Sequence, residues 1–434
     1  MTSTLIFILL VLILNSALTT WADVLNLKHL SLPLPEEFKA GAQGEWDEAK
    51  YQASLNYQRE GVIFELIRSN VHLMATLGFI LLGGFRWVDE IARGFGWSSI
   101  PTGLLFLGIL GVLKFFLQFP FSIYDTFVLE EKYGFNRTTW GLFLLDLIKG
   151  AILMGILGGL VFSGILYFFE SLGEHAWFYC WLSVTGFQLL LTYLAPVWIM
   201  PLFNRFEPLP EGELKQAIEG YARSRNFQLS GIYRMDSSKR STKSNAFFTG
   251  FGRFRRLVLF DTLIENHTVL ELLAVIAHEV GHFERKHILK SMVLSILTSL
   301  LVFFLLGLLM NREELFLAFQ MTSVSVYASL VFAGFIYAPL LRIVSIVSQV
   351  LSRKYEFEAD QFAVETSFQP EALVSALKKL SRDNLSHLTP HPLKVFLDYS
   401  HPPVLARIEA IRAHGRRMSA FKGSPFTQAP GSSR

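Results

Sequence analysis

The sequence predicts a mainly α-helical membrane protein that has about seven transmembrane helices and a smaller α+β domain. Of the 434 residues, 51% are hydrophobic and only 17% are charged, and the mean hydropathy of +0.39 is too high for an ordinary soluble enzyme. Apolar runs long enough to cross a bilayer recur along the chain. Residues 203–287 differ from these runs, because helical and strand-like patterns alternate there.

The predicted transmembrane spans are Leu5–Thr20, Val71–Trp87, Thr102–Phe121, Leu142–Phe169, Trp177–Met200, Ile288–Met310 and Met321–Leu351. The first run lacks a positively charged start and a small-residue cleavage site, so we expect it to be retained as a span rather than removed as a signal peptide. Residues 1–202 are therefore expected to form an N-terminal transmembrane domain of five spans.

Basic residues favour one orientation of these spans. The segments on one side carry Lys28, Lys39, Lys50, Arg59, Arg68, Lys132 and Arg137, whereas the short loops on the other side offer Arg86, Arg93 and Arg312. Because cytoplasmic loops are enriched in Lys and Arg, we expect residues 203–287 in the cytoplasm and the N-terminus outside. The formal net charge of +3 gives no information about partners, and nothing in the sequence indicates a nucleic-acid-binding surface.

The most informative stretch is His278-Glu279-Val280-Gly281-His282, which follows the apolar helical run Val269–Ala277. Residues i and i+4 share one helical face, so the two imidazoles can bind one zinc ion, and Glu279 is placed to polarise a metal-bound water. A pair of surface histidines is the alternative, but the preceding run is apolar almost all round, as in a buried helix. With Cys180 as the single cysteine, the metal must rest on His and carboxylate ligands. The motif predicts metal-assisted peptide hydrolysis.

The third protein ligand is expected in the segment after the last span. Glu356 and Asp360 are i and i+4 on one helical face, whereas Glu358 points elsewhere. One of the two carboxylates can bind zinc while the other orients a ligand imidazole. The alternative is an acidic helix start that pairs with Arg353 and Lys354.

Two later residues are candidates for stabilising a tetrahedral oxyanion, which needs a hydrogen-bond donor or a cation. His401 lies in the segment Tyr399–Pro403, and the helix that follows carries Arg407. From spacing alone, a histidine such as His401 is more often a capping or core residue. His287 lies five residues after His282 on another helical face, so we do not expect it to bind the metal.

A β-hairpin is expected just before the zinc helix. Residues 245–249 and 256–260 have strand-like composition and flank Gly250 and Gly252. A helix over 213–226 and a short strand over 231–235 precede them. The free edge of such a hairpin can bind an extended peptide through backbone hydrogen bonds, although an ordinary hairpin that covers a core fits the pattern equally well.

Together these motifs resemble those of the type I CAAX prenyl proteases, which are integral-membrane zinc metalloproteases. The resemblance covers about residues 40–412. Its blocks occur in the family's order, at residues 124–136, 201–204, 208–212, 238–241, 244–248, 278–282, 356–360 and 399–403.

The resemblance implies seven transmembrane helices that enclose an intramembrane chamber, capped by a thermolysin-like (gluzincin) α+β zinc protease domain over residues 203–413. It also implies one zinc ion per chain, bound by His278, His282 and Glu356. Glu279 would be the general base, and Asp360 would support the site by orienting a ligand. His401 and Arg407 would lie near the substrate carbonyl and the zinc, and the substrate would pair with Asn245, Ala246 and Phe247.

Family members remove the three terminal residues of prenylated CaaX sequences, so the expected partners are a peptide or protein substrate and membrane lipids, with no obligate protein partner. Residues 414–434 are expected to be a disordered tail. They lack an endoplasmic-reticulum retrieval signal, and the chain has little insertion between the sixth and seventh spans. Both features favour a bacterial inner-membrane homologue over an endoplasmic-reticulum enzyme. Two alternatives are a membrane quality-control protease that needs no prenyl group and a transporter or channel with a structural zinc, for which Glu279 would have no use.

Overall fold

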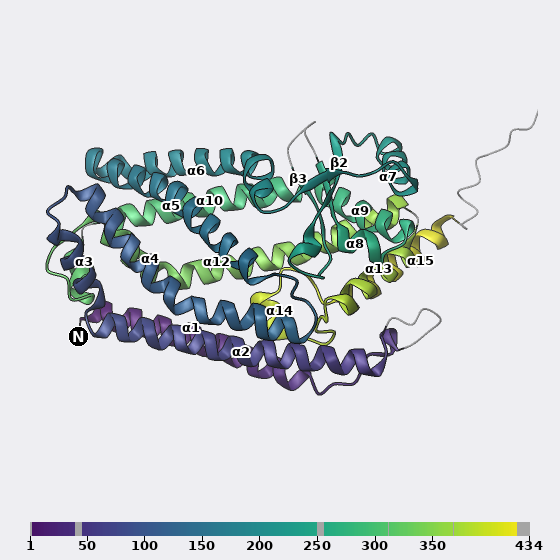
Figure 1. Cartoon of the computed structure of the whole chain (residues 1–434), viewed down its shortest axis with the longest axis horizontal. Coiled ribbons are helices and arrows are strands. Elements are labelled where there is room, and N and C mark those ends of the chain that lie inside the picture. Colours follow the sequence, from purple (N-terminus) through teal and green to yellow (C-terminus); the bar gives the residue numbers. More distant parts are fainter. Residues whose placement is uncertain (1, 40–45, 250–255, 311, 368, 423–434) are drawn as a thin grey trace, which may run out of the picture. The chain divides into compact units, whose positions relative to one another are not determined.

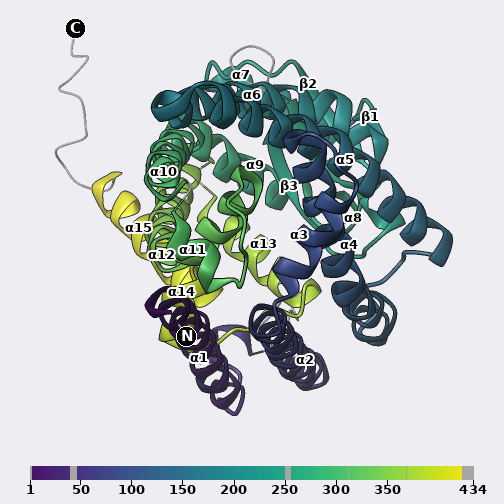
Figure 2. The ribbon, with the colours of Figure 1, turned by 90° about the vertical axis from the view of Figure 1, so that its left-hand side faces the viewer.

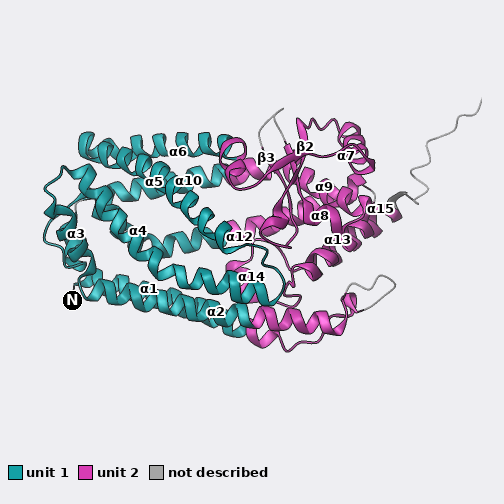
Figure 3. Ribbon diagram, in the orientation of Figure 1, with its two compact units in different colours: residues 1–25, 60–195, 292–346 teal, residues 26–59, 196–291, 347–434 magenta. Residues whose placement is uncertain are grey.

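The computed structural model describes residues 2–39, 46–249, 256–310, 312–367 and 369–422, and most of these residues are helical (Figure 1). The chain forms two compact units (Figure 3). Unit 1 comprises residues 1–25, 60–195 and 292–346, and unit 2 comprises residues 26–59, 196–291 and 347–434. Each unit is therefore assembled from separate stretches of sequence, whereas the sequence analysis divided the chain at residue 203.

Among the described residues, seven helical segments are long and apolar enough to cross a membrane. Figure 2 shows the unit 1 parts of their helices following one another around a ring, the arrangement that the resemblance implies. These helices are α1 (Ser3–His29), α2 (Glu48–Leu81), α4 (Ser99–Tyr124, continued by a π-helical turn at Asp125–Glu130), α5 (Trp140–Ser171), α6 (Ala176–Leu194, continued by a π-helical turn at Ala195–Ile199), α10 (His287–Leu309) and α12 (Val326–Ser367). Two shorter helices, α3 (Gly84–Gly94) and α11 (Glu313–Ala318), complete unit 1.

The second predicted span was placed wrongly. It was expected at Val71–Trp87, but α2 ends at Leu81, and the chain turns at Gly83, whose φ of 72° lies in the left-handed region that favours glycine. The next helix, α3, buries an apolar stripe that includes Phe85 and Val88 instead of continuing the span. Hydropathy alone cannot locate this break, because apolar residues lie on both sides of the turn.

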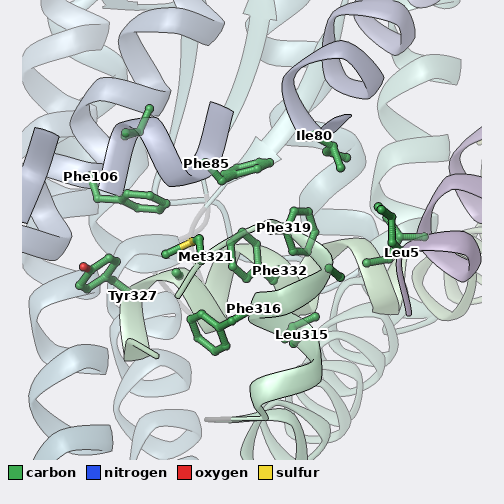
Figure 4. Packing of buried hydrophobic residues seen from close by; sticks show 14 of the residues in the cluster. Leu5, Ile80, Phe85, Phe106, Leu315, Phe316, Phe319, Met321, Tyr327 and Phe332 are labelled. Atoms are coloured by element: carbon green, nitrogen blue, oxygen red, sulfur yellow. The ribbon is translucent and has the colours of Figure 1, made fainter. Parts of the chain in front are cut away.

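An aromatic cluster forms the core of unit 1 (Figure 4). The rings of Phe319 and Phe332 are stacked with centroids 3.8 Å apart, and Phe85 packs against both rings edge to face. A buried polar contact lies beside them, where the Tyr327 hydroxyl donates to Asp89 Oδ1 over 2.5 Å. These contacts join α3, the end of α11 at its C-cap residue Phe319, and α12.

Unit 2 contains a four-stranded sheet of order β1-β2-β4-β3. The strands are β1 (Phe206–Pro208), β2 (Gly231–Met235), β3 (Ala246–Thr249) and β4 (Arg256–Phe260). The predicted hairpin is confirmed as an antiparallel pair in which Ala246 lies opposite Leu259 and Thr249 lies opposite Arg256, while its turn lies outside the described residues. The parallel pairing of β2 with β4 leaves β3 at the edge of the sheet.

The α-helices that lie wholly within unit 2 are α7 (Glu213–Ser224), α8 (Asp261–Asn266), α9 (Val269–Glu284), α13 (Pro370–Asp383), α14 (Pro392–Asp398) and α15 (Val404–Lys422). Unit 2 also contains one end each of α1, α2, α10 and α12. The sequence placed residues 414–434 in a disordered tail, but α15 continues to Lys422, so the first part of that segment is helical. Residues 423–434 lie outside the described residues.

Candidate active site

Helix α9 carries the two motif histidines, and its start is held by a capping box. The Thr268 side chain accepts from the backbone N–H of Glu271, and the Glu271 carboxylate accepts from the backbone N–H of Thr268. Ser375 and Lys379 of α13 also donate to the Glu271 carboxylate, over 2.6 and 2.8 Å. These hydrogen bonds fix α9 against α13 about two turns before His278.

A glycine allows α9 to lie close to α12. A Cβ added at Gly281 would lie 3.1 Å from the backbone of Ala359 and 3.1 Å from Phe362 Cβ, which is tighter than an ordinary contact. The glycine between Glu279 and His282 therefore brings the two helices together. This approach brings the residues of the H-E-x-x-H motif opposite Glu356 of α12.

The His278, His282 and Glu356 side chains converge on one point. His278 Nε2 and His282 Nε2 are 3.1 Å apart, and the nearest Glu356 oxygens are 3.5 Å from His278 Nε2 and 3.2 Å from His282 Nε2. Zn–N bonds of 2.0–2.1 Å in a tetrahedral site imply ligand atoms about 3.3 Å apart. Glu356 is buried, and its Oε2 makes no hydrogen bond, although Arg407 Nη1 lies 3.1 Å away. A cation would satisfy this oxygen, so the three residues fit a metal site.

Asp360 and Arg407 form a buried layer behind the three convergent side chains. The Asp360 Oδ1 atom lies 2.8 Å from His278 Nδ1, so this carboxylate can fix the tautomer that leaves Nε2 free for a metal. Arg407 donates to both Asp360 oxygens, over 2.7 and 2.8 Å. Burial alone would lower the pKa of His278, but the Asp360 carboxylate raises it to about 9.

Glu279 and the sheet edge line a cavity of about 760 Å³, together with the three convergent side chains. Burial raises the pKa of the Glu279 carboxyl, which suits a group that takes up and releases a proton. The edge strand β3 contributes Ala246 and Phe247, and Asn245 precedes it. Part of the wall between α8, α9 and α13 is apolar, formed by Leu263, Val275, Leu373, Leu377 and Leu380.

His401 and Arg407 also line the cavity, but their surroundings differ. The His401 side chain is 63% exposed, and its Nε2 lies 3.3 Å from Glu356 Oε1. Its Nδ1 contacts Ser400 Oγ over 2.9 Å. Arg407 is buried, donates to both Asp360 oxygens, and also has its Nη2 within 3.4 Å of His278 Nδ1. His401 is therefore the more accessible donor, and Arg407 holds Asp360 in place.

Two residues that the sequence analysis set aside lie next to the site. His287 Nδ1 is 3.1 Å from His282 Nδ1, and His287 Nε2 is 3.0 Å from Glu358 Oε2. Glu358 points away from the His278–His282–Glu356 group, as expected, but the sequence analysis overlooked its contact with His287. Helical spacing does not predict the position of His287, because α9 ends at Glu284 and Lys286 has a φ of 58°. In the sequence, a helix-ending signal between His282 and His287 would have indicated this turn.

The chain is similar to known proteins along most of its length. Residues 23–205 match the family model described as CAAX prenyl protease N-terminal, five membrane helices, and residues 208–414 match peptidase family M48. A probable CAAX prenyl protease 1 of Schizosaccharomyces pombe is 36% identical over 379 residues, which cover 84% of this chain and 80% of that protein. The CAAX prenyl protease 1 homolog of Homo sapiens is also 36% identical over 379 residues, which cover 77% of this chain and 80% of that protein.

A solved structure shares the fold. The crystal structure of Ste24p from S. mikatae superposes with a TM-score of 0.88 at 30% sequence identity and covers 95% of this chain and 99% of that one. The likeness therefore extends over the membrane helices and the sheet-containing unit alike. The chain is a membrane metalloendopeptidase that belongs to peptidase family M48 and, within it, to the CAAX prenyl proteases.

Proposed function

We propose that this chain cleaves prenylated CaaX-type peptides near their C-terminus with one bound zinc ion. The observation that carries the proposal is the convergence of His278, His282 and Glu356 beside Glu279 in one cavity. Two imidazoles and one carboxylate are the donor set of a catalytic zinc site that keeps a position open for water or substrate. When bound there, zinc would polarise the scissile carbonyl and acidify a water molecule.

The protein groups divide the remaining work. Glu279 takes a proton from the attacking water and returns it to the leaving amine, for which its raised pKa is suited. Asp360 contacts His278 Nδ1 and so keeps Nε2 available to the metal that His278 would bind. His401, the more exposed of the two later candidates, donates to the oxyanion.

The substrate backbone is expected to add to the sheet along Asn245, Ala246 and Phe247. These residues line the same cavity as Glu279. Strand β3 is the last strand in the sheet order and pairs with β4 on one side. The apolar part of the wall, which includes Val275 and Leu380, would receive the aliphatic side chains of a CaaX sequence. The CAAX activity named for the relatives supports this substrate class.

The bias in basic residues supports an orientation in which residues 203–287 are cytoplasmic and the N-terminus is outside. We infer a bacterial inner membrane from the compact chain, which has little insertion between the sixth and seventh membrane helices, α10 and α12. Membrane lipids would then surround the seven apolar helical segments. We propose that the protein functions without an obligate protein partner.

The test is cleavage of a farnesylated CaaX peptide by purified protein in detergent, with a non-prenylated copy alongside. Wild type should release the three terminal residues and favour the farnesylated copy, whereas Glu279→Gln should lose about 10²–10⁴-fold in rate and retain zinc. Equal cleavage of both copies would instead identify a membrane protease that does not require the prenyl group. The proposal fails if zinc-loaded wild type cleaves neither copy, or if Glu279→Gln remains active.

A further inference from the structure

We propose that His287 and Glu358 form a hydrogen-bonded relay that positions His282 for metal binding. The inference rests on the proposed metal site, because it assigns the outer partner of one ligand. His287 is thus a positioning residue and not a fourth ligand. The juxtaposition involves three elements of unit 2, namely the end of α9, the start of α10 and the Glu356–Asp360 turn of α12.

The contacts form a continuous chain. His282 Nδ1 lies 3.1 Å from His287 Nδ1, and His287 Nε2 lies 3.0 Å from Glu358 Oε2. Both distances lie in the normal range for a hydrogen bond to nitrogen or oxygen. The His282 atom used here is the ring nitrogen opposite to the one that faces His278 and Glu356, so the relay and the metal need different atoms of the same ring.

Proton placement along this chain is unambiguous once His282 binds a metal through Nε2. A neutral imidazole that gives one nitrogen to a metal carries its proton on the other, so His282 Nδ1–H donates. His287 Nδ1 must then accept, which puts the His287 proton on Nε2. That Nε2–H donates to the Glu358 carboxylate, and each donor therefore meets an acceptor.

Packing holds the His287 ring in the orientation that the relay needs. The His287 side chain is 3% exposed, and its ring stacks on that of Tyr355 with centroids 4.3 Å apart and planes 10° apart. Two cations lie close by: Lys354 Nζ is 3.7 Å from Glu358 Oε1, and Lys290 Nζ lies 5.3 Å from the Tyr355 ring centroid. A buried, stacked imidazole has few other rotamers available, so it can limit rotation of His282.

The relay supports the His282 ring through its Nδ1, as Asp360 supports the His278 ring. Each of the two imidazoles has its Nδ1 within 3.1 Å of a partner, Asp360 directly in one case and His287 backed by Glu358 in the other. Partners of this kind fix the tautomer and the ring orientation, and their removal usually costs about 10–100-fold in metal affinity or activity.

The test measures the zinc dissociation constant of detergent-purified protein by competition with a chromophoric chelator, and the visible absorption spectrum of the Co²⁺-substituted protein. His287→Phe keeps the ring on Tyr355 but removes both nitrogens, and should weaken zinc binding by about 10–100-fold and shift the Co²⁺ spectrum. His287→Asn retains an acceptor near the Nδ1 position and should recover most of the affinity. Glu358→Gln keeps the shape of the side chain without its charge and should have an intermediate effect.

The matched control is His414→Phe, which removes another His–Glu contact of unit 2, 3.2 Å from His414 Nε2 to Glu365 Oε1, and should leave zinc binding unchanged. Wild-type affinity and an unshifted spectrum in His287→Phe would overturn the relay. If that variant does not fold, Glu358→Gln decides in the same way, since wild-type values there would overturn it as well. Failure of the proposed function would look different, because zinc-loaded wild type would bind metal with the relay intact and cleave no CaaX peptide.

Discussion

Replacing Arg407 with methionine should destabilise unit 2 strongly, because the change leaves a buried negative charge without its partner. Arg407 is buried, and it donates to both oxygens of Asp360, which is 2% exposed. Its Nη1 also lies 3.1 Å from the buried carboxylate of Glu356. Methionine fills much of the volume of the arginine stem and carries no charge, so the change isolates the electrostatic loss.

The magnitude follows from the burial of both carboxylates. Breaking one buried ion pair by removing a partner costs about 3–5 kcal/mol. In a unit of roughly 200 residues, 1 kcal/mol shifts Tm by about 2–4 °C, which predicts a fall of about 6–20 °C. Adding Asp360→Asn removes the stranded charge, so the double variant should be more stable than Arg407→Met alone, with a coupling energy of about 0.5–3 kcal/mol.

Thermal unfolding in detergent, followed by tryptophan fluorescence, provides the measurement. The control is Arg412→Met, because Arg412 also contacts two glutamates, Glu37 and Glu371, but the side chains of Arg412, Glu37 and Glu371 are 30%, 25% and 64% exposed. Solvent screens such partly exposed pairs, and surface pairs contribute about 0–1 kcal/mol, so this variant should lose fewer degrees than Arg407→Met. Equal Tm values for the two arginine variants would refute the reasoning.

Three further predictions concern the zinc helix. His282→Ala should lose the metal, as measured by metal analysis of the purified protein, and full zinc occupancy would mean that the ligand set is wrong. Hydrogen bonds from Lys379 and Ser375 outweigh burial and lower the pKa of Glu271 to about 2 from 4.5, so this carboxylate stabilises the fold above pH 4.5 and the contribution is lost as the pH falls towards 2. The Tm deficit of Glu271→Gln should thus be full at pH 7 and shrink below pH 4.5, whereas a deficit independent of pH would contradict the assignment. Gly281→Ala should lower the free energy of unfolding by about 1–3 kcal/mol and weaken zinc binding, because the added Cβ meets the Ala359 backbone. As the control, Gly220→Ala in α7, where a Cβ has open space, should raise the free energy of unfolding by up to about 1 kcal/mol.

Local sequence patterns predicted the parts of the site that depend on a single element. The i, i+4 spacing of His278 and His282 needs only a helix, and the apolar run and the capping box supply one. The antiparallel pairing of β3 with β4 likewise follows from two strand-like segments close in sequence. The choice of Glu356 over Asp360 as the ligand came only from the family resemblance, because the two lie on the same helical face and differ in which one reaches His282.

Other features depend on where the chain bends, and hydropathy does not record bends. The turn at Gly83 ended α2 before the predicted end of the second span. The left-handed conformation at Lys286 likewise turned His287 back towards His282, which a continuous helix would have prevented. Strand β1 was missed because it has three residues, too few for an alternating pattern to be recognised.

The site depends on the rotational position of α12, because three contacts of the site come from the single turn Glu356–Asp360. Glu356 faces the motif histidines, Asp360 one turn later contacts His278, and Glu358 on a different face reaches His287. A single segment therefore offers one of the three proposed ligands and the residues that contact the Nδ1 side of both imidazoles. Because successive helical residues are about 100° apart, a one-residue shift of α12 would remove all three contacts together. Gly281 permits the close approach of the two helices that makes these contacts possible. We infer that the packing of α9 against α12 is what creates the site, and that each side chain then follows from its position on those two helices.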